Sequence, residues 1–224
     1  MCYETKQPDI GEVILGKDCN IDANVILGYK TGRKIKDFAL KIGDNANIRA
    51  GSVIYGGTSI GKGFATGHNV VIREENIIGD NFNVWNGTTI DYGCKIGNNV
   101  KIHCNCYVAQ FTVIEDDAFM APGVTIANDI HPGCDFSQQC MKGPYIEKGV
   151  HIGVNVTILP FITIGEYSLI GSGAVVIKDV PPGSVVVGNP GKVICSIYDL
   201  KCQTGLTDEP YKNILLNGSL PQDK

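Results

Sequence analysis

Four histidines are the side chains of this sequence best suited to proton transfer near neutral pH, at positions 68, 103, 131 and 151. Neutral imidazole titrates near working pH and can take a proton from an attacking amine or hydroxyl. His103, in the string KIHCN, is the first candidate for a general base. His131, in the string ANDIHPGC, is its rival. His151 precedes a core position and is expected to point outward without a role.

A six-residue repeat defines the elements that carry these histidines. Read at every sixth residue, all core positions except one threonine are Ile, Val or Met: Ile42, Ile48, Ile54, Ile60, Thr66, Ile72, Ile78, Val84, Ile90, Ile96, Ile102, Val108, Ile114, Met120 and Ile126. The positions two residues earlier are mostly small or β-branched, as in Ser52, Thr58 and Thr88. Residues two apart in a strand share a face, so both sets are expected to point inward.

Three such segments can close into one coil of a parallel β-helix, with neighbouring coils about 4.8 Å apart. The repeat predicts an all-β domain over residues 11–195, because helical or sandwich spacing is absent. Two interruptions, at about 28–41 and 127–145, are expected to be surface loops. Residues 196–224 are expected to form a short helix and a loose tail.

Residues eighteen apart stack in columns along such a coil. One column contains Trp85 and His103, and another contains Arg73 and Asp91. We expect these corner positions to need positive φ and therefore to prefer glycine, which marks Trp85, Asp91 and His103 as candidates for a site. Asp91 is expected to orient the histidine or an acceptor amine, or else to form a simple surface pair with Arg73.

The hexads and the run GSGAVVIKDVPPGSVVVGNPGKVI resemble the left-handed β-helix acyltransferases with hexapeptide repeats. KIHCN resembles the K/R-[IL]-H-S-N stretch of the sugar-modifying members, with Cys104 in place of serine. TGHNVVIREE resembles their TGH-x-V-x-IRE segment, which implies that His68, Arg73 and Glu74 contact the acceptor or a neighbouring subunit. A surface pair of Arg73 with Glu74 is the alternative.

The loop around His131 resembles the NDxxP and T-x-HP loops of sugar acyltransferases. Asn128 and Asp129 precede it as in the nucleotide-sugar N-acyltransferase branch, which favours His103 as the base. In galactoside and maltose O-acetyltransferases the HP histidine is the base, so His131 and O-acetylation stay open. Trp85 offers an aromatic face for a nucleotide base or sugar.

The resemblance also implies the acyl donor, acetyl-CoA or another acyl-CoA, lying along the last coils. Small residues there suit pantetheine contacts to the backbone, and Lys192 suits the CoA phosphates. The small residues are Gly153, Gly171, Ser172, Gly173 and Ala174. A cap over the open end of the β-helix is the alternative for this segment. A homotrimer is expected, because the candidate residues lie on two corners of one prism and a neighbour must supply the facing wall.

Composition narrows the function classes. Lys and Arg total 19 against 23 Asp and Glu, a net charge of −4, which argues against nucleic-acid binding. No apolar run approaches the ~18 residues of a membrane span, and no signal core is evident, so we expect a cytoplasmic protein without membrane insertion. The histidines lack the close pair of a γ-carbonic-anhydrase zinc site, so no metal is expected. An inert β-helical scaffold is a further alternative.

Overall fold

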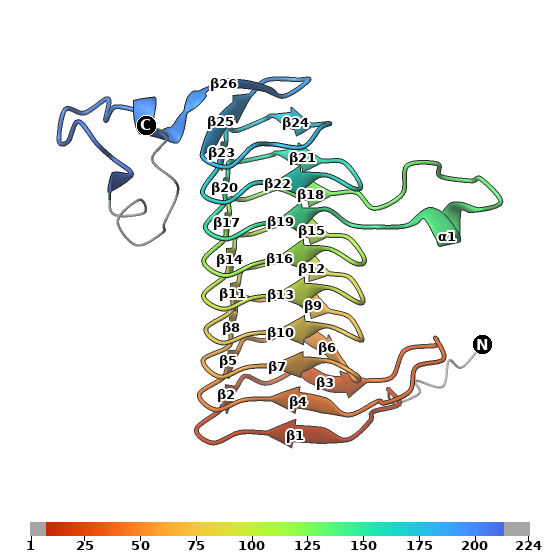
Figure 1. Cartoon of the computed structure of the whole chain (residues 1–224). Helices are drawn as coiled ribbons and strands as arrows, with labels where there is room; N and C mark the ends of the chain where they lie inside the picture. The colour runs from red at the N-terminus through yellow and green to blue at the C-terminus, as the bar shows by residue number, and fades with distance from the viewer. Residues whose placement is uncertain (1–7, 213–224) are drawn as a thin grey trace, which may run out of the picture.

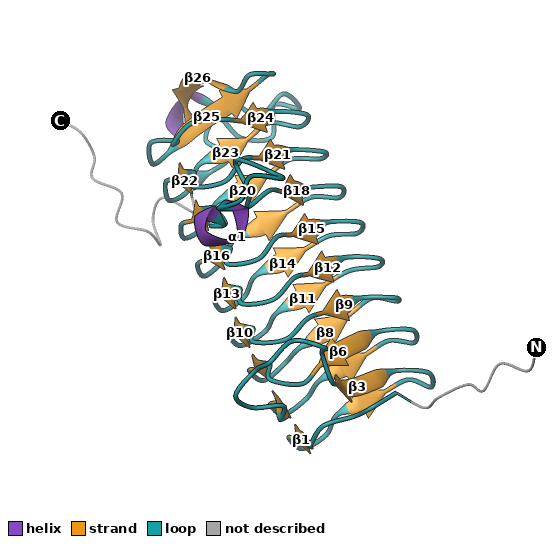
Figure 2. Ribbon diagram, turned by 90° about the vertical axis from the view of Figure 1, so that its right-hand side faces the viewer, coloured by secondary structure: helices purple, strands orange, loops and turns teal. Residues whose placement is uncertain are grey.

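A computed structural model describes residues 8–212 as a three-sided coil of short strands (Figure 1). Each turn of the chain contributes one strand to each of three sheets, and the turns stack along one axis (Figure 2). All strand pairs up to β25 inside these sheets are parallel. The parallel β-helix predicted from the hexads, left-handed as the resemblance implies, is confirmed.

The strands are short, most of them two residues long. Sheet B holds β1 (Val13–Leu15), β4 (Leu40–Ile42), β7 (Ser59–Ile60), β10 (Ile77–Ile78), β13 (Lys95–Ile96), β16 (Val113–Ile114), β19 (Tyr145–Ile146) and β22 (Thr163–Ile164). Sheet C holds β2 (Asn20–Ile21), β5 (Asn47–Ile48), β8 (Ala65–Thr66), β11 (Asn83–Val84), β14 (Lys101–Ile102), β17 (Phe119–Met120), β20 (His151–Ile152), β23 (Leu169–Ile170), β25 (Ser184–Val187) and β26 (Lys192–Ser196). Sheet A holds β3 (Ile26–Tyr29), β6 (Val53–Tyr55), β9 (Val71–Ile72), β12 (Thr89–Ile90), β15 (Tyr107–Val108), β18 (Thr125–Ile126), β21 (Thr157–Ile158) and β24 (Val175–Val176).

The core follows the hexad pattern. Every core position from Ile42 to Ile126 is buried, including Thr66 at 5% exposure. The second set also points inward, and its two phenylalanines, Phe64 and Phe82, stack with ring centroids 6.0 Å apart. Consecutive coils pair in register, so Val84 lies beside Ile102. The same residue type therefore meets the same environment in each coil, which is why the repeat predicts the fold.

The left-handed backbone conformation falls elsewhere than expected. Positive φ occurs at the third residue after a core position, for example at Asn99 with φ 57° and at Gly87 with φ 69°. Trp85, Asp91 and His103, which directly follow core positions, do not have positive φ, so the expectation for them was wrong. Glycine recurs at the equivalent place after sheet B because a Cβ at Gly61 would lie 2.7 Å from the backbone of Gly79.

Three edges join the sheets, and we call them the B/C, C/A and A/B edges. The chain leaves the coil twice, both times at the A/B edge (Figure 1). Loop 1 (residues 30–39) connects β3 to β4, and loop 2 (residues 127–144) connects β18 to β19 and contains the short helix α1 (Ser137–Cys140). Candidate side chains near this edge can therefore meet residues from either loop.

The C-terminal end of the coil differs from a simple terminal turn. Strand β26 pairs antiparallel with β25, and a single turn of 3-10 helix, η1 (Ile197–Asp199), follows. Residues 200–212 of the predicted tail have no strand, and residues 213–224 lie outside the described residues. Among residues 8–212, no helix has the length and apolar character of a membrane span.

Candidate functional site

A row of aromatic side chains surrounds His103 on the C/A edge. Trp85 follows β11 and His103 follows β14, one coil further on, with ring centroids 6.3 Å apart. On its other side, the His103 ring lies 5.2 Å from that of Phe119, edge to face. Trp85 is 44% exposed and His103 is half-buried. Among residues 8–212, the hydrogen bonds of His103 involve its backbone, as when its carbonyl accepts from the Thr88 hydroxyl at 2.7 Å, and none involves its imidazole.

The same row continues past Phe119 to His151. These two rings lie 6.0 Å apart at 89°, and the Tyr211 ring lies 6.4 Å beyond His151. Burial lowers the pKa of His151 below its ordinary value. His151 thus lies among aromatic rings, and the loss of water contact there disfavours its charged form.

The string TGHNVVIREE is divided between two edges. His68 follows β8 on the C/A edge, where its side chain is exposed and its backbone amide donates to Asn86 Oδ1 at 2.9 Å. Arg73 and Glu74 follow β9 on the A/B edge. Because a strand of sheet A separates them, His68 cannot act together with Arg73 and Glu74 at one point of this chain.

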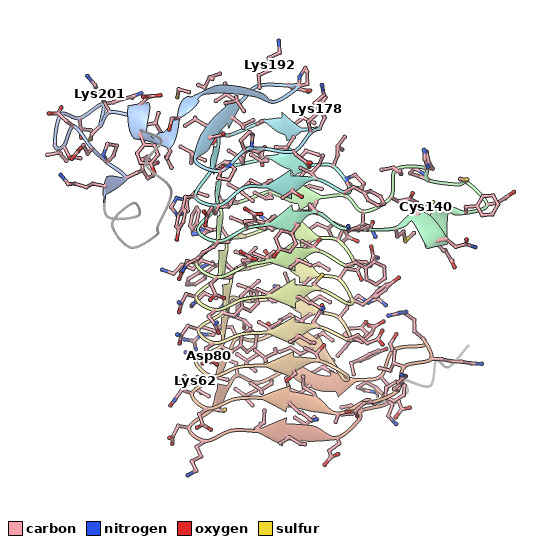
Figure 3. All side chains as sticks on the ribbon, in the orientation of Figure 1. Lys62, Asp80, Cys140, Lys178, Lys192 and Lys201 are labelled. Atoms are coloured by element: carbon pink, nitrogen blue, oxygen red, sulfur yellow. The ribbon has the colours of Figure 1, made fainter. Side chains whose placement is uncertain are left out.

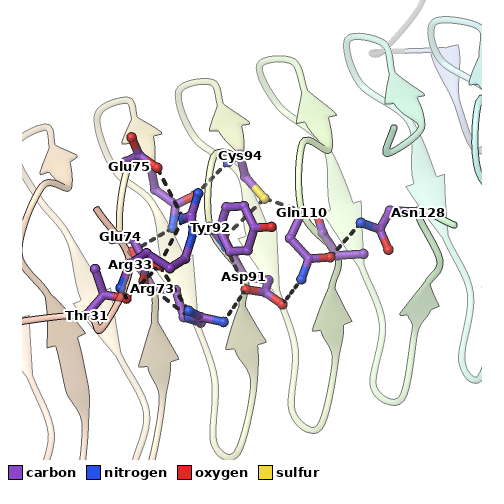
Figure 4. A network of polar contacts seen from close by, with 12 residues as sticks. Thr31, Arg33, Arg73, Glu74, Glu75, Asp91, Tyr92, Cys94, Gln110 and Asn128 are labelled. Carbon is purple, nitrogen blue, oxygen red and sulfur yellow. Dashed lines mark hydrogen bonds and ion pairs between the residues drawn. The ribbon is translucent and has the colours of Figure 1, made fainter. Parts of the chain in front are cut away.

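Glu74 is fully buried beneath loop 1 (Figure 4). Arg33 Nη1 and Thr31 Oγ1 from the loop each donate to Oε1 at 3.0 Å, as does Arg73 Nη2. Burial acts to raise the pKa of Glu74, but these donors and its own backbone amide hold it below its ordinary value. The expectation that Glu74 contacts an acceptor disagrees with this burial. The carboxylate instead holds loop 1 against the coil.

Asp91 is also buried, on the A/B edge one coil beyond Arg73. The guanidinium of Arg73 donates to Oδ1 at 3.1 Å, which is the pair expected from their eighteen-residue offset. Tyr107 Oη at 2.7 Å and Gln110 Nε2 at 2.6 Å donate to Oδ2. Burial and the bond to Asp91 raise the pKa of Tyr107 to about 12. Within one chain Asp91 does not contact His103, which projects from a different edge.

Loop 2 presents the remaining predicted acceptor residues. Asn128 Nδ2 donates to Gln110 Oε1 at 2.6 Å, so the start of the loop joins the Asp91 network. Asp129 accepts from the His131 backbone amide at 2.8 Å and from the Ser137 hydroxyl. The Ser137 hydroxyl and the His131 amide lower the pKa of Asp129. The His131 side chain is exposed on a backbone that Asp129 fixes.

The predicted CoA-binding residues line the C/A edge beyond His103. Gly153 follows β20 and Gly171 follows β23, so both stand in the same column as Trp85 and His103. Figure 1 shows β20 and β23 near the C-terminal end of the coil. Their amides, and those of Gly173 and Ala174, already donate to carbonyls within the coil. Contacts from pantetheine amides to these residues would therefore involve backbone carbonyls as acceptors.

Steric crowding explains two of these glycines without a ligand. A Cβ at Gly153 would lie 2.6 Å from the Ser172 nitrogen, and one at Gly171 would lie 2.8 Å from a Val187 methyl. Ala174 is buried. Lys192, in β26, extends from the end of the coil into solvent (Figure 3). The segment is thus both a cap for the β-helix and an exposed backbone surface with the Lys192 side chain at its end.

Sequence reasoning missed the residues that join the loops to the coil. Arg33 joins loop 1 to the coil: it donates to Glu74, and its guanidinium lies 3.6 Å from the Tyr92 ring centroid. Gln110 joins Asp91 on the coil to Asn128 at the start of loop 2. Gln110 and Asn128 are eighteen residues apart, so the column offset that pairs Arg73 with Asp91 could have found them. The predicted residues form two groups, one on each of two edges.

An open depression of about 440 Å³ lies on sheet B, lined by Ile77, Lys95, Val113, Tyr145 and Lys148 among others. It contains none of the predicted site residues. Within the described part of the chain, no three His, Cys, Asp or Glu side chains are grouped so that they could hold a metal ion.

Known proteins share the repeat and the fold. The family model described as bacterial transferase hexapeptide (six repeats) matches residues 93–128 and 143–178. A Staphylococcus aureus (strain COL) protein named "Putative acetyltransferase SACOL2570" is 51% identical over 70 residues, 28% of this chain and 35% of that protein. A serine acetyltransferase of Buchnera aphidicola is 36% identical over 107 residues, 43% of this chain and 38% of that protein. The chain thus spans little more than a third of the length of these relatives.

A solved structure extends the agreement in fold to most of the chain. The UDP-N-acetylglucosamine acyltransferase from Campylobacter jejuni superposes with a TM-score of 0.59, covering 79% of this chain and 75% of that one at 17% identity. At that identity the likeness concerns the fold alone. Residues 93–128 and 143–178 are thus similar to the bacterial transferase hexapeptide repeats, and the three parallel sheets extend that repeat architecture along the chain.

Proposed function

We propose that this protein is an acyl-CoA-dependent acyltransferase that acetylates the amino group of a nucleotide-linked amino sugar. The observation that carries the proposal is the arrangement of groups along the C/A edge. The His103 imidazole, which has no hydrogen-bond partner among the described residues, lies in one column with the 44% exposed Trp85 indole. The exposed backbone of the last coils continues the same column. The acetyltransferase names of the relatives support the same reaction class.

The reaction is direct attack. The amine nitrogen forms a bond to the thioester carbonyl carbon, the bond from that carbon to sulfur breaks, and CoA leaves as the thiol. His103 takes the proton that the amine nitrogen loses and passes it to the departing sulfur, and a backbone N–H stabilises the oxyanion. Trp85 stacks on the nucleotide base or sugar, and Lys192 meets the CoA phosphates. No metal has a part in this scheme.

The active unit in this proposal is a homotrimer. The histidine edge and the loop 2 edge of one chain are separated by sheet A, so they do not face each other. A second copy that presents its A/B edge to the C/A edge of the first would bring Asn128 and Asp129 opposite His103. Each site would then be built from two chains, as closed cyclic assemblies allow.

A second candidate function rests on His131. Its backbone is fixed by Asp129 while its side chain is exposed, which suits a base that acts on a hydroxyl group of a sugar or polysaccharide. In that case the enzyme is an O-acetyltransferase.

Paired variants separate the two functions. Thiol release from acetyl-CoA is measured with nucleotide-linked amino sugars and with free sugars as acceptors. We expect His103→Ala to lower kcat/KM by about 10²–10⁴-fold, the usual contribution of a general base, and His131→Ala to change it much less. The reverse ranking, with a hydroxyl acceptor preferred, would establish the second function. Wild-type kcat/KM in both variants would refute both base assignments.

A further inference from the structure

The A/B edge contains a chain of side-chain hydrogen bonds whose direction is fixed at one end. The Asp91 carboxylate is the fixed end, because a carboxylate accepts and does not donate. Its Oδ1 accepts from Arg73 and from the Tyr92 backbone amide at 2.8 Å, and its Oδ2 accepts from Tyr107 and Gln110. Since Asp91 is only 5% exposed, no water can easily replace these donors.

Because the Asp91 carboxylate can only accept hydrogen bonds, it sets the orientation of the Gln110 amide. An amide group is planar, with two donors on its nitrogen and an acceptor on its oxygen. With its nitrogen 2.6 Å from Asp91, Gln110 must direct Oε1 away from that carboxylate, toward Asn128. Turning the amide over would bring two oxygens together at Asp91. Gln110 is therefore held in one orientation (Figure 4).

The orientation of Asn128 follows in turn. Its nitrogen donates to Gln110 Oε1, so its own Oδ1 is directed away from the coil. Across residues 8–212, nothing donates to this oxygen, and the residue is half-buried. The backbone carbonyl of Asn128 accepts from Lys142 at 2.9 Å, which closes the base of loop 2 and fixes the residue further.

We propose that Asp91 and Gln110 are positioning residues that hold the Asn128 carbonyl oxygen toward the bound acceptor. The site then selects, at this point, an acceptor group that donates a hydrogen bond, an amine or a hydroxyl. This inference rests on the proposed function only in placing the acceptor against Asn128. A link that merely tied loop 2 to the coil would have the same hydrogen-bond directions, but its loss would not change the acceptor KM selectively.

A double-mutant cycle tests the direction of the hydrogen bonds without any substrate. Asn128→Asp turns the donor into a carboxylate that faces Gln110 Oε1. Gln110 cannot turn its amide over in response, because the Asp91 carboxylate can only accept a hydrogen bond from its nitrogen. In Asp91→Asn the amide can turn over, because an asparagine at position 91 can donate to Gln110 Oε1. We expect the unfolding midpoint of the double variant to lie about 2–4 °C above the additive value, the shift for a coupling of about 1 kcal/mol in a chain of this size.

A matched control comes from another edge. Asn99 donates to Asp117 and accepts from Asn81, each at 3.0 Å, in a similar ladder on the B/C edge. Asn99→Asp combined with Asp91→Asn should be additive, because the two share no partner. If the effects of Asp91→Asn and Asn128→Asp are additive, the fixed hydrogen-bond direction from Asp91 through Gln110 to Asn128, which we call the relay, is refuted. This holds whether or not an acceptor has been identified.

Kinetics then test the consequence for the site. In thiol release from acetyl-CoA with the best nucleotide-linked amino sugar, Asp91→Asn should raise the acceptor KM about tenfold, as for loss of one oriented hydrogen bond, and leave the acetyl-CoA KM unchanged. Equal changes in both KM values, or none, would refute the positioning role. If wild-type protein transfers acetyl to no acceptor, the proposed function fails, while the unfolding cycle still decides on the relay.

Discussion

Replacement of Glu74 by glutamine tests the buried ion network beneath loop 1. Glu74 is 0% exposed and receives hydrogen bonds from Arg33, Arg73 and Thr31 at 3.0 Å. Glutamine has nearly the same shape, but it removes the negative charge between two guanidinium groups and points an NH₂ at their donors. Breaking a buried ion pair costs about 3–5 kcal/mol, and we expect the low end because one accepting oxygen remains.

A loss of about 3 kcal/mol in the free energy of unfolding corresponds to a fall in unfolding midpoint of about 6–12 °C for a chain of this size. The assay is thermal unfolding followed by circular dichroism at neutral pH. The matched control is Glu75→Gln at the next position, where the side chain is 44% exposed and pairs with Arg33 at 3.1 Å. That surface pair should contribute no more than about 1 kcal/mol.

The pH dependence supplies a second check on Glu74. Its pKa in the folded protein lies below the ordinary value, so the unfolded chain binds more protons as the pH falls. The stabilisation is complete above the ordinary pKa of about 4.3 and is lost as the pH falls through the folded value. The difference in midpoint between wild type and Glu74→Gln should therefore shrink in acid. Equal midpoints for the Glu74 and Glu75 variants at neutral pH would refute the buried network.

Three further predictions concern the coil and Tyr107. Phe82→Ala removes half of a buried stacked pair and should cost about 3–5 kcal/mol in chemical unfolding; a loss below about 1 kcal/mol would mean that the core collapses around the gap. Gly61→Ala places a Cβ 2.7 Å from the next coil and should lower the unfolding midpoint, whereas Gly32→Ala, with open space around it, should not; equal effects would contradict the crowding. Ultraviolet titration should show Tyr107 losing its proton with a pKa of about 12. Because the unfolded chain loses this proton near pH 10, the contribution of Tyr107 to stability falls as the pH rises above about 10. Tyr107→Phe should remove that late titration step.

Much of the fold could be predicted because the repeat imposes one environment on each sixth residue. Ile102 and Met120 are buried for the same reason as Ile48, so a periodic sequence was enough. The antiparallel β26 and the helix α1 escaped prediction, since neither belongs to the repeat. The prediction of positive φ directly after core positions was wrong. Glycine recurs there after sheet B because the next coil approaches closely, not because the backbone is left-handed.

The candidate site was predicted only in part. The column offset gave the contact of Arg73 with Asp91, found at 3.1 Å. It could not reveal that Arg33, 41 residues from Glu74, folds back with loop 1, because such contacts depend on the path of an irregular segment. Asp91 is separated from His103 because Asp91 follows a strand of sheet A, on the A/B edge, whereas His103 follows a strand of sheet C, on the C/A edge.

The most direct test of the central claim is detection of the product. Wild-type protein is incubated with acetyl-CoA and a panel of nucleotide-linked amino sugars, and the N-acetylated sugar is measured by mass spectrometry together with the free thiol. The account predicts equal amounts of product and thiol, with both nearly abolished in His103→Ala. Thiol release that is independent of an acceptor, or full product formation by His103→Ala, would contradict it.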